Sequence, residues 1–318
     1  MIKQERKSKM KNNNYEIIKS LLTIIFLLLF NQQLFCEISQ DSIFKQPVIF
    51  MSSQMLDEID MNVAFIHSFD FTPQKQILLS SLNQFYLLEW ESFMPLAPVL
   101  PTLTGAFAYN SENKLLIISE NSLCSLNTQN QLVELYPLPC KNMGISCGKN
   151  SVVYVYDKIK QEKHIIYKLK DKEAPVKILE LSTPITSVLE VNENILFATQ
   201  NKIYSANLKN KTIEALVQLS NSNEKIISIT QDYVNDILYF STNDAVYALK
   251  DRQSGCVIEQ IGGLIKCYNN ELYVFNPRKK FLISFYINNV FGKKEPKSTN
   301  KRKAVDKNTV QTNTTKKK

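Results

Sequence analysis

Histidine and cysteine offer the widest chemistry of any residues in this sequence, and both are thinly spread. The two histidines, His67 and His164, are 97 positions apart and fall in different predicted strands. A hydrolase must bring a nucleophile, a base and an orienting group together. The chain has no GxSxG, HExxH, phosphate-binding-loop or dinucleotide-binding motif. We therefore expect no catalytic residue and no cofactor, and interpret both histidines as packing or surface residues.

The cysteines do not follow a metal-binding pattern. They are Cys36, Cys124, Cys140, Cys147, Cys256 and Cys267, and no two are spaced as CxxC, so no zinc site is expected. Cys256 and Cys267 flank the Gly262-Gly263 turn between two predicted repeats, and a disulfide between them would join those repeats. A second candidate pair is Cys140 with Cys147 or Cys124, and buried free thiols are the alternative to both. Either disulfide would need an oxidising compartment.

Two further polar motifs resemble possible sites. The acidic residues Asp57, Glu58 and Asp60 lack the ligand spacing and the glycine of a calcium loop, so a solvated turn is expected there and no metal. Asn210 begins the sequon Asn210-Lys211-Thr212 on a predicted turn, and is therefore a candidate glycosylation site if the chain enters a eukaryotic secretory pathway.

The elements that must position these residues are short strands. Residues 185–219 read as four apolar or alternating runs separated by Asn- and Lys-rich turns, which suits an antiparallel meander and is too short for helices. Similar units recur at intervals of 35 to 43 residues when the second strand is the anchor. The anchors are Ile77, Leu115, Val152, Ile195, Ile237 and Leu272.

Six such units predict an all-β, six-bladed β-propeller, because a single four-stranded meander cannot bury both of its faces. The sixth unit is one strand short after residues 281–287. We predict that a strand at about residues 45–52 pairs into the last blade and closes the ring, which removes open sheet edges. The proline-containing segment 92–104 is expected at the rim, either as an edge strand of its own blade or as an apolar partner-binding lip, and Trp90 is expected to pack.

The two ends of the chain differ from its body. The formal net charge of the whole chain is +8. The first 36 residues contribute +4 and residues 293–318 contribute +8, which leaves a net charge of −4 for residues 37–292. A nucleic-acid footprint on the folded body is therefore not expected. Residues 1–36 contain an apolar run of about ten residues, which favours a cleaved signal peptide, with an uncleaved signal anchor as the alternative. Residues 293–318 are predicted to be a disordered Lys-rich tail.

The segments ENILFATQNKIYSANLKNKTIEALV and NDILYFSTNDAVYALK resemble repeats of six-bladed propellers of the YWTD and NHL types. The resemblance covers about residues 63–290 and concerns architecture. Similar folds include calcium-dependent lactonases, whose metal would need converging Glu, Asn and Asp ligands near the channel. Only Asp70 and Glu190 lie on predicted inner strands, so the resemblance transfers no metal site.

The function expected from these observations is a secreted or membrane-anchored module that binds a protein or glycan partner. The basic tail would contact an acidic surface, and the amino-terminal segment would allow membrane association. A metal-dependent hydrolase resembling the lactonases is the first alternative. A nuclear protein that uses its basic tail is the second. Three or more oxygen ligands converging on the propeller axis would favour the enzyme, and their absence would favour binding.

Overall fold

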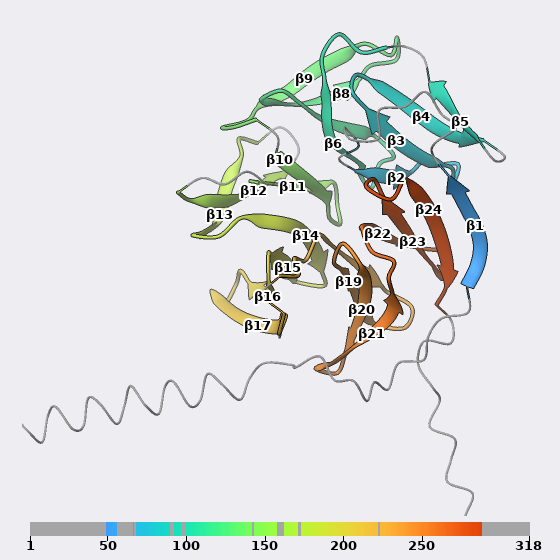
Figure 1. The fold of residues 1–318 in the computed structure, drawn as a ribbon. Coiled ribbons are helices and arrows are strands. Elements are labelled where there is room, and N and C mark those ends of the chain that lie inside the picture. Colours follow the sequence, from blue (N-terminus) through green and yellow to red (C-terminus); the bar gives the residue numbers. More distant parts are fainter. Residues whose placement is uncertain are drawn as a thin grey trace, which may run out of the picture.

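The described residues form twenty-four β-strands, and each runs antiparallel to its sheet neighbours. The computed structural model describes residues 49–55, 66, 68–89, 92–96, 99–141, 143–157, 162–170, 173–221 and 223–287. Six sheets of four strands stand in a ring (Figure 1), which confirms the predicted six-bladed propeller. Within the described ranges no helix has the length and hydropathy needed to cross a membrane.

The sheets are numbered here as blades 1 to 6 in chain order. Blade 1 consists of β2 (Phe69–Phe71), β3 (Ile77–Ser81), β4 (Gln84–Glu89) and β5 (Ser92–Leu96). Blade 2 consists of β6 (Thr104–Tyr109), β7 (Leu115–Ser119), β8 (Ser122–Leu126) and β9 (Leu132–Pro137). Blade 3 consists of β10 (Met143–Cys147), β11 (Val152–Asp157), β12 (His164–Lys170) and β13 (Val176–Leu181). Blades 4 and 5 consist of β14 (Ile185–Val191), β15 (Asn194–Thr199), β16 (Lys202–Asn207) and β17 (Thr212–Gln218); and β18 (Ser228–Asp232), β19 (Ile237–Ser241), β20 (Ala245–Lys250) and β21 (Gln253–Glu259). Blade 6 consists of β22 (Leu264–Tyr268), β23 (Glu271–Asn276), β24 (Phe281–Tyr286) and β1 (Ile49–Met55).

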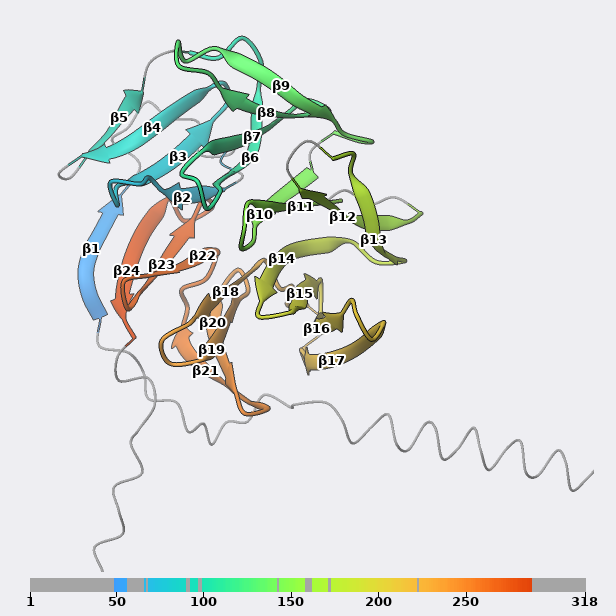
Figure 2. The ribbon, with the colours of Figure 1, turned by 180° about the vertical axis from the view of Figure 1, so that it is seen from behind.

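The last blade takes its outermost strand from the start of the described chain. β1 pairs antiparallel with β24 from Ile49 opposite Phe285 to Met55 opposite Phe281, with a register shift between Phe50 and Gln54. The strand predicted at about residues 45–52 therefore lies a few residues later and pairs as expected. In both views β1 flanks β24 at the outside of the ring (Figures 1 and 2). This pairing covers what would otherwise be an open sheet edge.

The core is divided into six hydrophobic clusters, and each lies between two neighbouring blades. Strand periodicity explains the arrangement, because successive side chains point to opposite faces of a sheet. Leu78 packs between blades 1 and 2, and Leu79 between blades 1 and 6. In the same way, Tyr239 packs between blades 5 and 6, and Phe240 packs between blades 4 and 5. Each sheet is thus buried on both faces only by its neighbours.

The turns use few glycines, since the whole sequence contains only 7. Positive φ values occur mainly at asparagine, aspartate and lysine residues, for example Asn113, Asn192 and Asp236. Asparagine and aspartate tolerate this left-handed conformation better than other side chains that have a Cβ.

Several sequence predictions can be placed directly. Residues 92–96 form β5, the outermost strand of blade 1, so the edge-strand interpretation is confirmed for this part of segment 92–104. Residues 99–103 are not in a strand, and Val99 and Leu103 are exposed. His164 is fully buried in β12, as expected of a packing residue. His67, Trp90, the acidic residues at 57, 58 and 60, the predicted signal segment and the Lys-rich tail lie outside the described residues.

Candidate functional site

The innermost strand of each blade lines a central channel. These strands are β2, β6, β10, β14, β18 and β22, and neighbouring members contact one another around the ring. A cavity of about 440 Å³ lies at the end of the channel where these strands terminate, and residues from all six line it. A second cavity of about 410 Å³ lies at the other end, where the innermost strands of blades 4, 5 and 6 begin.

Side-chain hydroxyls tie successive innermost strands together. Ser68 Oγ accepts a hydrogen bond from the Phe107 amide at 2.9 Å, and Ser187 Oγ accepts one from the Ile229 amide at 3.3 Å. Thr230 Oγ1 accepts a hydrogen bond from the Cys267 amide at 3.0 Å. The amides belong to strands whose inner edge has no further strand to pair with, so the acceptors satisfy buried backbone donors. Small hydroxyl residues facing the channel are therefore structural.

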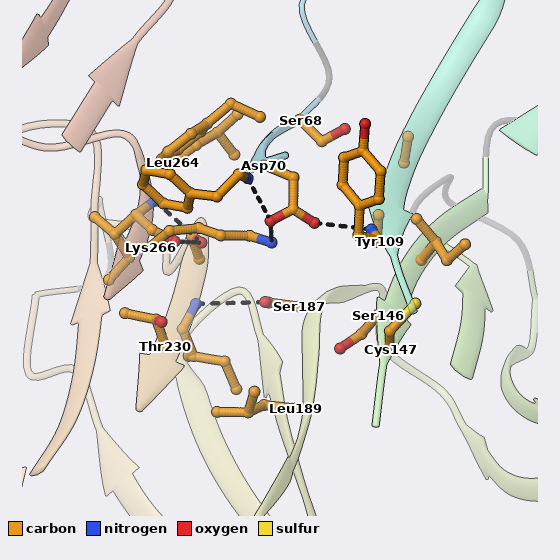
Figure 3. Close-up of a pocket in the computed structure, with 18 of the residues that line it drawn as sticks. Ser68, Asp70, Tyr109, Ser146, Cys147, Ser187, Leu189, Thr230, Leu264 and Lys266 are labelled. Atoms are coloured by element: carbon orange, nitrogen blue, oxygen red, sulfur yellow. Dashed lines mark hydrogen bonds and ion pairs between the residues drawn. The ribbon is translucent and has the colours of Figure 1, made fainter. Parts of the chain in front are cut away.

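Asp70 is the carboxylate that lines the first cavity, and its oxygens are already engaged (Figure 3). Its Oδ1 lies 2.6 Å from Lys266 Nζ and accepts the Phe71 amide at 2.9 Å, while Oδ2 accepts the Tyr109 amide at 3.1 Å. Burial, with a smaller contribution from the Asp70 charge, raises the pKa of Tyr109 to about 12. Asp70 thus links blades 1, 2 and 6 and presents no free oxygen pair to a metal.

Glu190, the other acidic residue singled out from the sequence, lies near the same end of the channel on β14. Its Oε2 accepts the Lys149 amide at 3.1 Å, and its backbone carbonyl accepts the Tyr233 hydroxyl at 3.2 Å. Burial and then the nearby Glu190 charge raise the pKa of Tyr154, whose hydroxyl also bonds to Glu190. Glu190 therefore connects the turns of blades 3, 4 and 5.

A third carboxylate near this end, Asp232, caps the turn that follows β18. Its Oδ1 accepts the amides of Val234 and Asn235 at 2.9 and 3.2 Å, and its Oδ2 accepts the Asn235 side-chain amide at 2.7 Å. Over the part of the chain that the structure describes, no group of three or more His, Cys, Asp or Glu side chains is placed to hold a metal ion.

The structure does not bring the candidate disulfide together. Cys256 lies on β21, the outermost strand of blade 5, and Cys267 on β22, the innermost strand of blade 6. The two thiols are free and pack against different hydrophobic clusters. Burial raises the pKa of Cys256 to about 11. Sequence nearness across the Gly262-Gly263 turn was misleading, because that turn carries the chain from the outside of one blade to the channel side of the next.

Cys124, Cys140 and Cys147 are also free thiols. Cys140 donates a hydrogen bond from Sγ to Asp157 Oδ1 at 2.7 Å. Cys147 lines the channel, and burial raises its pKa to about 12, with the Asp70 charge as a second cause. Burial also raises the pKa of Cys124 to about 11, so Cys124 and Cys147 are held in the neutral form, which suits packing rather than nucleophilic chemistry.

Asn210 lies in the turn between β16 and β17, where its side chain is exposed. Its backbone amide, like that of Lys209, donates to Asn207 Oδ1, so these bonds hold the turn and leave the Asn210 side chain unused by them. The sequon is therefore sterically accessible.

Sequence reasoning missed the rim of the first cavity. Tyr233 and Val234 are 61% and 78% exposed, and Tyr233 lines the cavity. Tyr268 stacks on Phe71 with ring centroids 4.3 Å apart, which fixes one wall of the cavity. The motif QDYVND carries the signal that was available, since two large apolar residues stand where a turn is expected.

Comparisons with known proteins support the fold and leave the chemistry open. No family model matches the chain, and no curated protein is similar to it in sequence. Among solved structures, the chain resembles the extracellular domain of what is described as a one-component system of B. thetaiotaomicron, with a TM-score of 0.53 and 13% identity over 69% of this chain and 32% of that one. This chain therefore spans about a third of that protein.

Two other solved structures match at similar levels. A gluconolactonase from Xanthomonas campestris has a TM-score of 0.59 and 11% identity over 78% of this chain and 96% of its own. A structure of a nidogen/laminin complex has a TM-score of 0.55 and 11% identity over 67% of this chain and 89% of its own. At these identities the likeness shows a shared six-bladed architecture, which both binding proteins and enzymes use.

Proposed function

We propose that this chain is an extracellular binding module whose propeller binds a protein partner at the end of the ring where the innermost strands terminate. The observation that carries the proposal is the exposure of Tyr233 and Val234, at 61% and 78%, beside the 440 Å³ cavity. Exposed large apolar and aromatic side chains beside a concave surface are typical of protein interfaces.

The electrostatics of this end of the channel support the same function. The carboxylates of Asp70, Glu190 and Asp232 are each engaged by neighbouring donors. A hydrolase would need at least one of them free to act as a base or metal ligand. These contacts instead hold the surface in shape, and a surface shaped before binding loses less entropy when a partner binds.

Extracellular location is supported by neighbours of similar fold. They include extracellular domains and a propeller solved in a nidogen/laminin complex. The predicted signal segment, either cleaved or retained as a membrane anchor, would deliver the chain there. The Lys-rich tail would contact an acidic surface. A fluorescent tag at the carboxyl end tests both location and the nuclear alternative, since nuclear fluorescence would exclude this function.

Photo-cross-linking of the full-length chain tests the binding surface. A benzophenone amino acid at position 234 is expected to cross-link a discrete partner in the native cell. The matched control places it at Ile213, which is 51% exposed on the outermost strand of blade 4. Identical adducts from both positions, or none from position 234, would contradict the proposal. An adduct that a glycosidase removes would assign the surface to glycan instead.

A lactonase is the second candidate, because the gluconolactonase match covers nearly the whole of that enzyme. The rate at which the purified chain hydrolyses an aldonolactone, with calcium or zinc added, tests for lactonase activity. We expect no metal-dependent rate, since the described channel residues do not form a ligand cluster.

A further inference from the structure

The opposite end of the channel has a different character. Its cavity of about 410 Å³ has an apolar floor, formed by Ile66, Ile185 and Ile226, which are all at most 5% exposed. The polar lining includes Gln200 and Asn243, which both lie in turns. An apolar floor with a few polar groups at one side is typical of small-ligand sites.

The charges lining this cavity are all positive. Among the described residues, Lys225 and Arg278 line it, and no aspartate or glutamate does. Both side chains are exposed, and neither makes an ion pair or a side-chain hydrogen bond with another described residue. Two cations with no carboxylate between them favour an anionic ligand.

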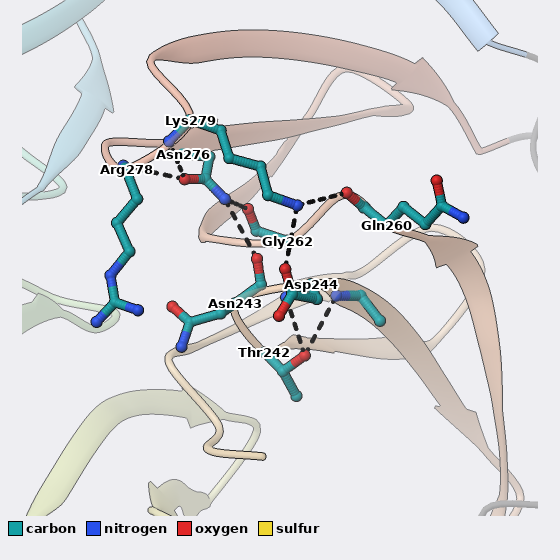
Figure 4. Close-up of polar contacts among 9 residues, drawn as sticks. Thr242, Asn243, Asp244, Gln260, Gly262, Asn276, Arg278 and Lys279 are labelled. Atoms are coloured by element: carbon teal, nitrogen blue, oxygen red, sulfur yellow. Dashed lines mark hydrogen bonds and ion pairs between the residues drawn. The ribbon is translucent and has the colours of Figure 1, made fainter. Parts of the chain in front are cut away.

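Lys279, the neighbour of Arg278, differs from it because its side chain is bound by other residues of the protein. Its Nζ lies 3.0 Å from Asp244 Oδ1 and 2.9 Å from the Gln260 carbonyl. Figure 4 shows the Arg278 side chain extending away from these contacts while Lys279 points into them. Of the two adjacent cations, one is engaged by the protein and the other remains available to a ligand.

Hydrogen bonds from the buried Asn276, which is 3% exposed, hold the turn that carries Arg278. Its side-chain amide donates to the carbonyls of Gly262 and Asn243 at 2.6 and 3.2 Å, and its Oδ1 accepts the amides of Arg278 and Lys279 at 3.0 and 2.8 Å. The base of the Arg278 side chain is therefore held in place before any ligand arrives, which favours binding.

Glycine keeps the neighbouring wall of the cavity close to this turn. A Cβ at Gly262 would lie 2.2 Å from the Thr242 carbonyl oxygen, and Gly263 has a φ of 141°. Only glycine allows this close approach and this backbone conformation. Gly262-Gly263 therefore shapes the wall of the cavity.

We propose that this cavity binds a carboxylate attached to a small apolar body, with Arg278 and Lys225 contacting the carboxylate and the isoleucine floor contacting the apolar part. A guanidinium matches a carboxylate with two parallel hydrogen bonds, and the ammonium adds a second positive charge. This site lies at the opposite end of the channel from the proposed partner surface and does not depend on it. The carboxylate comes either from a free organic acid or from the end of a peptide.

Isothermal titration calorimetry on the full-length chain tests the site with octanoate and with its neutral analogue octanamide. We expect octanoate to bind about tenfold more tightly than octanamide. Arg278→Gln and Lys225→Gln should each remove most of that difference and leave octanamide binding unchanged. Lys279→Gln, which changes the net charge equally, should preserve the preference, since Asp244 and Gln260 already engage Lys279.

A short peptide ending in leucine, with a free or an amidated carboxyl terminus, distinguishes the two sources. Tighter binding of the free-acid peptide than of octanoate would assign the site to chain ends, and the reverse order would assign it to free acids. Equal binding of acid and amide forms in both series would overturn the proposal. So would an Arg278→Gln variant and a Lys225→Gln variant that both bind octanoate as the wild type does.

Discussion

Lys266 Nζ lies 2.6 Å from Asp70 Oδ1, so an ion pair joins the innermost strands of the first and last blades. The Asp70 side chain is 12% exposed and that of Lys266 36% exposed. Beside them, Phe71 and Tyr268 stack across the same boundary. The boundary between blades 1 and 6 is where the ring closes, and it is therefore held on its channel side by charge and aromatic packing.

We expect Asp70→Asn to lower the free energy of unfolding by about 2–3 kcal/mol, because it leaves a partly buried ammonium without its counter-charge. The new amide would also place donor hydrogens toward groups that are donors themselves, namely Lys266 and a backbone amide. Equilibrium unfolding in urea, followed by tyrosine fluorescence or circular dichroism, measures the change.

The matched control is Lys209→Met. Lys209 pairs with Glu193 at 2.8 Å, but the two side chains are 70% and 66% exposed. A pair so exposed contributes little, and we expect a change within about 0.5 kcal/mol. If the two variants lose similar stability, the Asp70–Lys266 pair does not hold the ring closed.

The propeller could be predicted from the sequence because its signal is local and repeated. Each second strand begins at or next to its predicted anchor; β3 begins at Ile77, β7 at Leu115 and β19 at Ile237. An apolar run between two turns defines each of them without reference to any distant residue. Six repeats of one local pattern then leave few arrangements that bury every face.

The site could not be predicted in the same way, because its contacts are not local. Lys266 and Asp70 are 196 positions apart, and nothing in either segment indicates the other. Arg278 and Lys279 look equivalent in the sequence, yet Asp244 and Gln260 engage only Lys279. Which charge is available to a ligand depends on the packing of neighbouring blades.

Removal of β1 should weaken closure from the outside of the ring. We expect a chain beginning at residue 57 to melt at a lower temperature than one beginning at residue 37 and to aggregate, because β24 would present an unpaired edge. Calorimetry and light scattering compare the two. Equal melting temperatures would show that pairing between β1 and β24 adds nothing to stability.

The thiols should be slow to react in the native state. Burial raises the pKa of Cys124 and Cys256 to about 11 from an ordinary value of 9. At about pH 8 the folded chain then holds about 100-fold less thiolate at these positions than the unfolded chain, and iodoacetamide should react correspondingly more slowly. Mass spectrometry of peptides labelled with and without urea measures each rate, and similar rates in both conditions would contradict the burial argument.

The same shifts predict a loss of stability at alkaline pH. The folded-state pKa of each thiol lies above its unfolded value, so the stabilisation is complete below about pH 9 and declines as the pH rises toward 11. Unfolding in urea at several pH values measures the decline. Substitution of Cys124 and Cys256 by serine should reduce its slope, and an unchanged slope would assign the alkaline loss to other groups.

Asn210 should carry a glycan when the chain passes through a eukaryotic secretory pathway, because the turn between β16 and β17 exposes its side chain. Asn210→Gln is expected to remove one endoglycosidase-sensitive increment of mass. The melting temperature should stay within about 1 °C, since the Asn207 side chain that fixes the turn is retained.

Asn313 begins a second sequon outside the described residues, so Asn313→Gln is the matched control. Thr212→Ala should reproduce the mass change of Asn210→Gln. An unchanged mass in both Asn210→Gln and Thr212→Ala would show that the chain does not meet the glycosylation machinery at this turn, and would also count against the extracellular location.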